Sequence, residues 1–282
     1  MVDIADNSGK ADLHVHTTAS DGTMTPTWVV EMAANIGLGA VGIADHDTMG
    51  GIKEALDAGR RRNIILVPGV EINTDFGKHE LHILGYFIDP DSSYLHDKLD
   101  YLRSERMTRG IRIVERLNQI GLKISMDRVK EIADGAVIGR PHIGRAIVEA
   151  GYTGSLNSAF GKYLVQGTPG FIDRYKLTPI DAIQIVKASG GVAVMAHPAK
   201  THDDEIIPEL VKAGLQGLEA YHTDHTSQQR RRYIKMAKKY DLLVTGGSDF
   251  HGPDNMKDIE IGNAVCDLSV VQQLRELAGN RD

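Results

Sequence analysis

Short apolar segments alternate with amphipathic segments over most of the chain. Seven apolar segments have the length and the Val, Ile and Leu content of buried strands, and they span residues 11–16, 40–45, 64–70, 80–87, 191–197, 217–221 and 242–246. Patterns of helical period predict helices at residues 26–36, 51–61, 178–189 and 227–240. Thr25 and Thr178 each precede a proline, which is typical of a capped first helical turn. Strands that alternate with helices predict a parallel α/β sheet or barrel.

Residues 92–176 depart from this alternation. A long helical pattern at residues 94–120 is followed by shorter ones at 126–133, 141–150 and 156–164, and none of the intervening segments has the pattern of a buried strand. We therefore predict a small helical subdomain at residues 92–176, inserted into an α/β barrel formed by residues 1–91 and 177–282.

The composition is that of an ordinary globular enzyme, and it mainly excludes some classes of function and of metal site. The 282 residues are 41% hydrophobic and 25% charged, and their net charge of −6 argues against indiscriminate binding to polyanions. Cys266 is the single cysteine, so the chain can form neither an internal disulfide nor a thiolate metal cluster. The sequence has no signal-peptide pattern and no apolar run near the roughly 18 residues of a membrane span. We expect a cytoplasmic protein that does not bind membranes.

Histidines and carboxylates gather where the predicted strands end. His14 and His16 lie two positions apart in the first strand, so they share a face and can bind one ion. The later strands run into or contain further side chains of the same kinds. The candidate metal ligands are His14, His16, Asp21, His46, Glu71, His82, His197, Asp249 and His251.

A metal centre explains this arrangement better than isolated structural roles do. A lone histidine at a strand end is more often hydrogen-bonded or solvated, but here seven strand ends each supply an imidazole or a carboxylate. Loops at the carboxyl ends of barrel strands converge on one site, and burying so many ionisable groups without a cation is unfavourable. Imidazoles and carboxylates without sulfur suit manganese, iron or zinc, and nine ligands predict two or three divalent ions.

These residues resemble the motifs of the polymerase and histidinol phosphatase (PHP) family. The matching segments are His14-Val15-His16 with Asp21, Asp45-His46-Asp47, Gly69-Val70-Glu71, His82, Ala196-His197-Pro198 and Ser248-Asp249-Phe250-His251. The resemblance implies a distorted seven-stranded β/α barrel with a trinuclear metal site. It also implies how the ligands are shared: His14, His16, Glu71 and Asp249 on one ion; Glu71, His82 and His197 on a second; Asp21, His46 and His251 on the third.

Within the family, the helical insertion and the segment Ile138-Gly139-Arg140-Pro141-His142 resemble a branch that acts on small nucleotides. That branch implies AMP-like compounds or nucleoside 3′,5′-bisphosphates as substrates, with relatives that degrade RNA as 5′–3′ exoribonucleases. Arg140 is the expected phosphate ligand, because its planar guanidinium suits phosphate oxygens. The alternative is an arginine at a helix start that pairs with a nearby acid.

Four more residues complete the expected site. His222 is expected to contact the phosphate or to protonate the leaving oxygen, with a role behind the metal ligands as the alternative. Asp45 is expected among the catalytic residues, where it orients metal ligands. Ser20 and Lys176 are expected to contact the substrate.

Our hypothesis is hydrolysis of a phosphate monoester on a small nucleotide by a hydroxide that bridges the metal ions. The alternatives are a 5′–3′ exoribonuclease on short RNA, a histidinol-phosphate phosphatase, and a non-catalytic metal-binding module. The oligomeric state is left open. Five arginines at helical spacing bear on the RNA alternative: Arg103, Arg106, Arg109, Arg112 and Arg116. They either track an RNA backbone or, as we favour, form a solvated face balanced by acids such as Glu105 and Glu115.

Overall fold

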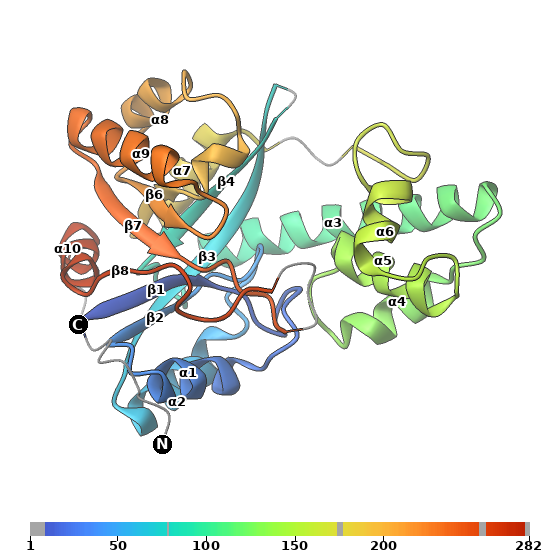
Figure 1. Ribbon diagram of the computed structural model, residues 1–282, viewed down its shortest axis with the longest axis horizontal. Helices are drawn as coiled ribbons and strands as arrows, with labels where there is room; N and C mark the ends of the chain where they lie inside the picture. Colours follow the sequence, from blue (N-terminus) through green and yellow to red (C-terminus); the bar gives the residue numbers. More distant parts are fainter. Residues whose placement is uncertain (1–8, 78, 174–176, 254–257, 280–282) are drawn as a thin grey trace.

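The computed structural model describes residues 9–77, 79–173, 177–253 and 258–279, and these form an α/β fold around a sheet of eight strands (Figure 1). The strand order is β7-β6-β5-β4-β3-β2-β1-β8. The strands are β1 (Lys10–Val15), β2 (Ala40–Ile43), β3 (Ile65–Phe76), β4 (His79–Tyr86), β5 (Val192–Met195), β6 (Gly217–His222), β7 (Leu243–Gly247) and β8 (Cys266–Asp267).

The sheet curves into a nearly closed barrel because the two ends of the seven-strand series meet. The segment after β7 runs along β1, where His16 N donates to the Phe250 carbonyl (2.9 Å) and Asp249 N donates to the His14 carbonyl (2.8 Å). Gly247 makes this approach possible, since a Cβ there would lie 2.2 Å from the His14 Cβ. The contact brings residues separated by more than two hundred positions in sequence to one end of the barrel.

The strand count and the strand directions both differ from the prediction. The eighth strand, β8, has two residues and pairs antiparallel with β1. β4 is antiparallel to both neighbours, because β3 and β4 form a hairpin in which Phe76 is opposite His79. The predicted parallel pairing therefore holds for β1, β2 and β3 and for β5, β6 and β7, but not for the pairs that β4 makes. β3 also continues past the predicted end at residue 70, through Asn73, Thr74 and Asp75, whose polarity hides the strand in the sequence.

Helices cover the outside of the sheet. They are α1 (Pro26–Asn35), α2 (Ile52–Arg62), α7 (Pro179–Ala188), α8 (Ile207–Ala213), α9 (Ser227–Lys239) and α10 (Ser269–Leu277), with the 3-10 turn η2 (Pro198–Lys200). In Figure 1, α1 and α2 lie on one side of the strands, and α7, α8 and α9 lie on the other. Thr25 and Thr178 cap α1 and α7 as predicted, each accepting a hydrogen bond from the third residue beyond it. The helices α8 and α10 were not predicted.

The remaining helices extend away from the barrel. They are α3 (Ser93–Gln119), α4 (Met126–Ala133), α5 (Arg140–Glu149), α6 (Leu156–Ala159) and the π-helical turn η1 (Phe160–Leu164). The first half of α3 packs into the main core through Leu95, Leu99 and Leu102, whereas its second half joins a separate apolar cluster with the shorter helices. We call the second half of α3 with α4, α5, α6 and η1 the helical projection (Figure 1). The domain boundaries at residues 92 and 176 stay a prediction.

Among the described residues, no helix has both the length and the apolar composition to cross a membrane.

Candidate metal centre

The nine predicted metal ligands meet at one end of the barrel. His14 lies in β1, Glu71 in β3 and His82 in β4, and the other six lie in segments that directly follow strands. The ligand atoms of eight of the nine fall into three groups with all separations within 4.8 Å: His14, His16, Glu71 and Asp249; His16, Asp21, His46 and His251; and His46, Glu71 and His82. His197 is in none of these groups, so the expected second set is represented by Glu71 and His82 alone. The first group is the expected first ligand set, and the second contains the expected third set.

Glu71 lies at the centre of the cluster. Its Oε1 is 2.7 Å from His82 Nδ1 and 3.1 Å from His197 Nε2. Its Oε2 is 3.0 Å from His46 Nδ1 and 3.2 Å from His16 Nε2. His14 Nε2 lies 3.4 Å from the same Oε2. Five imidazoles from four separate segments thus face one buried carboxylate, which is the position expected of a residue that bridges two ions.

The unsatisfied atoms of the cluster fit bound metal. Within the part of the chain that the structure describes, His14 Nε2, both ring nitrogens of His16, Glu71 Oε2 and His197 Nδ1 are buried and make no hydrogen bond. A buried polar atom without a hydrogen-bond partner destabilises the folded state. Five such atoms in one cluster therefore require an explanation. Imidazole nitrogens with carboxylate oxygens are ligands for divalent transition metals, and the residues therefore fit the group that the sequence predicts.

The charges of the cluster point the same way. Burial lowers the pKa of His16, but Asp249 and Glu71 outweigh it and raise that pKa to about 10. Burial opposes ionisation of Glu71 as well, yet His46, His82 and His14 hold the pKa of its carboxyl well below the usual range. Positive charge beside these buried carboxylates therefore stabilises the cluster. Either protons on the imidazoles or bound metal ions can supply that charge.

Sequence reasoning missed two acids that support the cluster. Glu219 of β6 is fully buried, lies 3.0 Å from His14 Nδ1 and accepts a hydrogen bond from His197 N (2.8 Å). A carboxylate on the second nitrogen of a metal-binding imidazole orients the ring. Asp12 accepts hydrogen bonds from Ser248 N (2.9 Å) and Gly262 N (2.8 Å), and burial raises its pKa to about 6. The available signal was a single acid inside an otherwise buried strand.

Asp45 and Ser20 are buried and contact each other beside the loop that carries Asp21. Asp45 accepts hydrogen bonds from Thr17 N (2.7 Å), the Thr17 hydroxyl (2.7 Å) and the Ser20 hydroxyl (2.6 Å), and both Asp45 and Ser20 are buried. These contacts fix the loop that carries Asp21. The expected role of Asp45 in orienting metal ligands and the expected contact of Ser20 with the substrate stay predictions.

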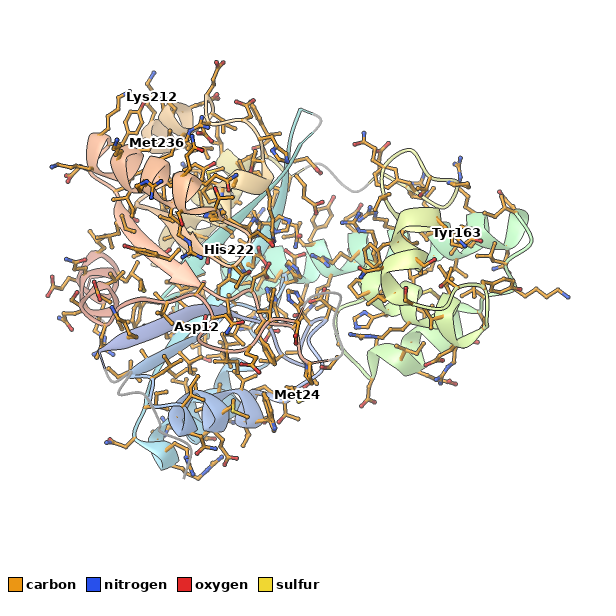
Figure 2. The ribbon with its side chains drawn as sticks, in the orientation of Figure 1. Asp12, Met24, Tyr163, Lys212, His222 and Met236 are labelled. Atoms are coloured by element: carbon orange, nitrogen blue, oxygen red, sulfur yellow. The ribbon has the colours of Figure 1, made fainter. Side chains whose placement is uncertain are left out.

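His222 is also enclosed. It lies among the barrel strands (Figure 2), fully buried, with Nε2 at 3.4 Å from Asp249 Oδ2 and Nδ1 accepting from Asp224 N (3.0 Å). His222 thus contacts the candidate ligand Asp249, and both of its expected roles stay predictions. The same Asp249 oxygen accepts a hydrogen bond from Lys200 Nζ (2.8 Å), a contact that the sequence did not suggest.

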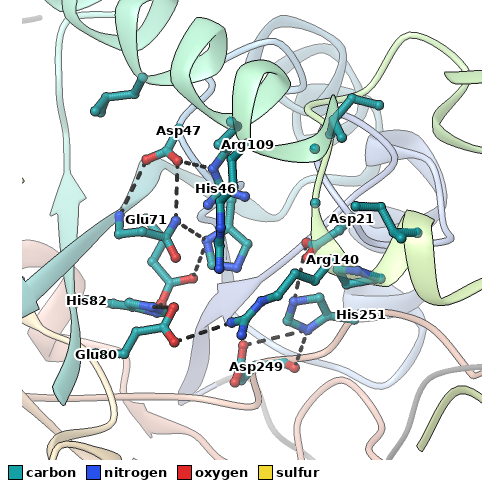
Figure 3. A pocket seen from close by; sticks show the side chains of 18 of the residues that line it. Asp21, His46, Asp47, Glu71, Glu80, His82, Arg109, Arg140, Asp249 and His251 are labelled. Atoms are coloured by element: carbon teal, nitrogen blue, oxygen red, sulfur yellow. Dashed lines mark hydrogen bonds and ion pairs between the residues drawn. The ribbon is translucent and has the colours of Figure 1, made fainter. Parts of the chain in front are cut away.

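A cavity of about 440 Å³ lies between the strand ends and the helical projection. Figure 3 shows histidines and carboxylates of the cluster along one part of its wall, with Arg109 and Arg140 among the residues around it. Arg140 starts α5, and its Nη2 is 3.3 Å from Glu80 Oε2, so it both lines the cavity and pairs with an acid. Lys176 lies outside the described residues.

The predicted row of arginines on α3 is neither a free RNA track nor a uniformly solvated face. Arg106 pairs with the buried Asp47, which also receives hydrogen bonds from Asn73. Arg109 Nε donates to the Ile172 carbonyl (2.8 Å) and Arg116 Nε donates to the Pro169 carbonyl (2.6 Å). Arg103 donates to the Thr48 hydroxyl (3.3 Å) and pairs with Asp100, so four of the five arginines contact specific groups of the protein.

Comparisons with known proteins agree with this geometry. The pattern of the PHP domain family matches residues 12–168. The 3′,5′-nucleoside bisphosphate phosphatase of Chromobacterium violaceum is 33% identical over 248 residues, covering 86% of this chain and 87% of the relative. The 5′–3′ exoribonuclease of Haemophilus influenzae is 34% identical over 249 residues, covering 86% and 90%. A solved Bifidobacterium adolescentis structure, assigned to the metal-dependent phosphoesterases, has a TM-score of 0.88 at 35% identity, covering 95% and 96%.

Proposed function

The chain belongs to the PHP domain family and is a metal-dependent phosphoesterase, and from this premise we propose that it hydrolyses phosphate monoesters of small nucleotides. AMP-like compounds and nucleoside 3′,5′-bisphosphates are the proposed substrates. The observation that carries the proposal is the two-sided lining of the cavity. One side consists of the candidate metal ligands, and the other combines arginines with apolar side chains of the helical projection.

A nucleotide likewise has a charged part, its phosphates, and a part with apolar faces, its base. Its phosphates carry the charge that Arg106, Arg140 and Lys200 can neutralise, and all three line the cavity. Its base has apolar faces that suit the Ile113 and Phe160 side chains on the opposite wall. The volume of about 440 Å³ falls in the usual range for sites of small molecules.

The chain would bind divalent ions through the His14, Glu71 and Asp249 cluster, and these ions would supply Lewis-acid polarisation and activation of water. The protein's own residues do the rest. Arg140 presents a planar fork to a phosphate, and Lys200 brings a cation to Asp249 at the edge of the cluster. The packed walls of the cavity hold the nucleotide in one orientation.

The test is phosphate release from adenosine 3′,5′-bisphosphate and from AMP in the presence of manganese, with a His14→Ala variant as control. We expect release from at least one nucleotide and its loss in the variant. A fully metallated protein that releases phosphate from neither compound would contradict the proposal.

A second candidate is 5′–3′ exoribonuclease action on short RNA, favoured by the similarity to the Haemophilus influenzae enzyme. The same assay with a 5′-phosphorylated RNA dinucleotide separates the two. Cleavage of the dinucleotide without release from either mononucleotide would favour this second function.

A further inference from the structure

Glu80 connects the candidate metal centre with the arginine of the cavity. It lies in β4 two positions before His82, so the two side chains share a face of the strand. Its Oε1 is 3.2 Å from His82 Nε2, and its Oε2 is 3.3 Å from Arg140 Nη2. On the other side of the ring, His82 Nδ1 is 2.7 Å from Glu71 Oε1. The result is an unbroken chain from Glu71 through His82 and Glu80 to Arg140, shown in part by Figure 3.

The contact with Glu80 gives the His82 ring a direction. A carboxylate at Nε2 accepts a hydrogen bond from the Nε2–H tautomer, which leaves the lone pair of Nδ1 free to face the cluster. Such a carboxylate also makes the imidazole more basic and fixes its plane. Glu80 therefore contacts one ring nitrogen of His82 in the same way that the buried Glu219 contacts Nδ1 of His14.

The contact with Arg140 crosses between two parts of the molecule. Arg140 belongs to α5 in the helical projection, and its guanidinium carbon lies 6.0 Å from the centre of the Phe160 ring. Glu80 belongs to the sheet. Arg140 Nη1 also donates to the Leu164 carbonyl (3.5 Å). The carboxylate of Glu80 adds a second contact that restricts the rotamers of this long side chain, while other N–H donors of the guanidinium stay available.

We propose that Glu80 is a positioning residue with two separate tasks: one oxygen fixes His82 as a metal ligand, and the other fixes Arg140 for an incoming phosphate. The first task needs only the metal centre, whereas the second rests on the proposed function. Since Glu80 is 42% exposed, its ion pairs contribute little to folding, and their effect is expected in ligand binding instead.

The two tasks can be separated by two substitutions. Glu80→Ala removes both contacts. Glu80→Gln keeps one acceptor oxygen for His82, but its amide group then faces Arg140 with a donor, so only the second contact is lost. Glu149→Gln is the matched control, because Glu149 lies on the same helix as Arg140 and pairs with Arg128 at the surface.

Metal affinity is measured first, by titrating metal-free protein with manganese. Glu80→Ala should weaken the binding by about 10- to 100-fold, while Glu80→Gln and Glu149→Gln should stay close to the parent protein. Unchanged manganese binding in Glu80→Ala would overturn the first task. This readout needs no substrate and therefore stands even if no nucleotide is hydrolysed.

Phosphate binding is measured second, by titrating the manganese-saturated proteins with inorganic phosphate. Both Glu80 variants should bind phosphate several-fold more weakly, and Glu149→Gln should not. Thermal unfolding should be unchanged in all three variants. Phosphate affinity equal to that of the parent in both Glu80 variants would overturn the second task.

Discussion

The strand-end cluster and the helical projection differ in how their polar residues find partners. In the cluster, side chains contact side chains, and Glu71 alone faces five imidazoles. In the projection, Arg109 and Arg116 of α3 instead donate to the backbone carbonyls of Ile172 and Pro169. The first arrangement builds a site for a ligand, and the second holds a loop in place. Similar densities of charge along a sequence thus serve different purposes, depending on what lies opposite them.

The sharpest way to test the cluster is to remove the charge at its centre. Glu71→Gln should lower phosphoesterase activity on the order of a thousandfold, because it removes the carboxylate shared by two predicted ligand sets. The bound metal, measured by elemental analysis after dialysis, should fall by at least one ion per chain. Full metal content with parental activity would show that Glu71 does not bridge.

The closure of the barrel should also be sensitive to a small change. Gly247→Ala would place a Cβ 2.2 Å from the His14 Cβ and 2.5 Å from the His14 nitrogen, so the strands must separate. We expect a loss of about 3 kcal/mol in the free energy of unfolding, measured with denaturant. The control is Gly161→Ala in the projection, where a Cβ would meet no described atom within 4 Å. Equal effects of the two substitutions would refute this account of closure.

The projection has its own acid-sensitive group. Burial lowers the pKa of His142 from 6.5 to about 4, and its Nδ1 accepts a hydrogen bond from Gly139 N. The neutral ring is favoured in the folded state, so its contribution is complete above pH 6.5 and is lost as the pH falls towards 4. The loss should be on the order of 3 kcal/mol.

His142→Gln isolates this contribution. Glutamine retains an acceptor for Gly139 N at the start of α5 but does not titrate. Unfolding of the parent and the variant is compared at pH 7 and pH 4.5. Stability of the variant should fall less on acidification, and parallel losses would locate the acid sensitivity elsewhere.

The smallest expected effect concerns the arginine row. Arg116→Met removes a hydrogen bond to Pro169 and should lower the free energy of unfolding by about 1 kcal/mol. Because Arg116 donates its hydrogen bond to a backbone carbonyl of the protein, the substitution should change the rates of hydrolysis of an RNA dinucleotide and of a mononucleotide to the same small extent. A selective loss on longer RNA would instead support the RNA track.

The cluster could be predicted because its residues interrupt apolar runs. His14, His46 and Asp249 are conspicuous at the ends of buried strands, and parallel strands bring their carboxyl ends together. Glu219 escaped notice because one acid inside a strand, three positions before a histidine, gives no hint of its partner across the barrel.

The rest of the fold depended on contacts that a local pattern does not encode. β8 has two residues, and its pairing with β1 joins positions more than 250 residues apart. The polar stretch at the end of β3 becomes a strand only because β4 folds back on it. The partners of Arg109 and Arg116 are carbonyl groups, which every residue carries, so residue types alone could not identify them.

Helix α3 limits how this protein can be recombined with its relatives. Its 27 residues span about 40 Å, and a single uninterrupted helix belongs to two apolar cores at once. Exchange of the whole segment from residue 92 would remove Leu95, Leu99 and Leu102 from the barrel and expose the surface beneath them. A chimera that alters substrate choice should therefore join its parents inside the helix, after Leu102, where the chain passes from one core to the other.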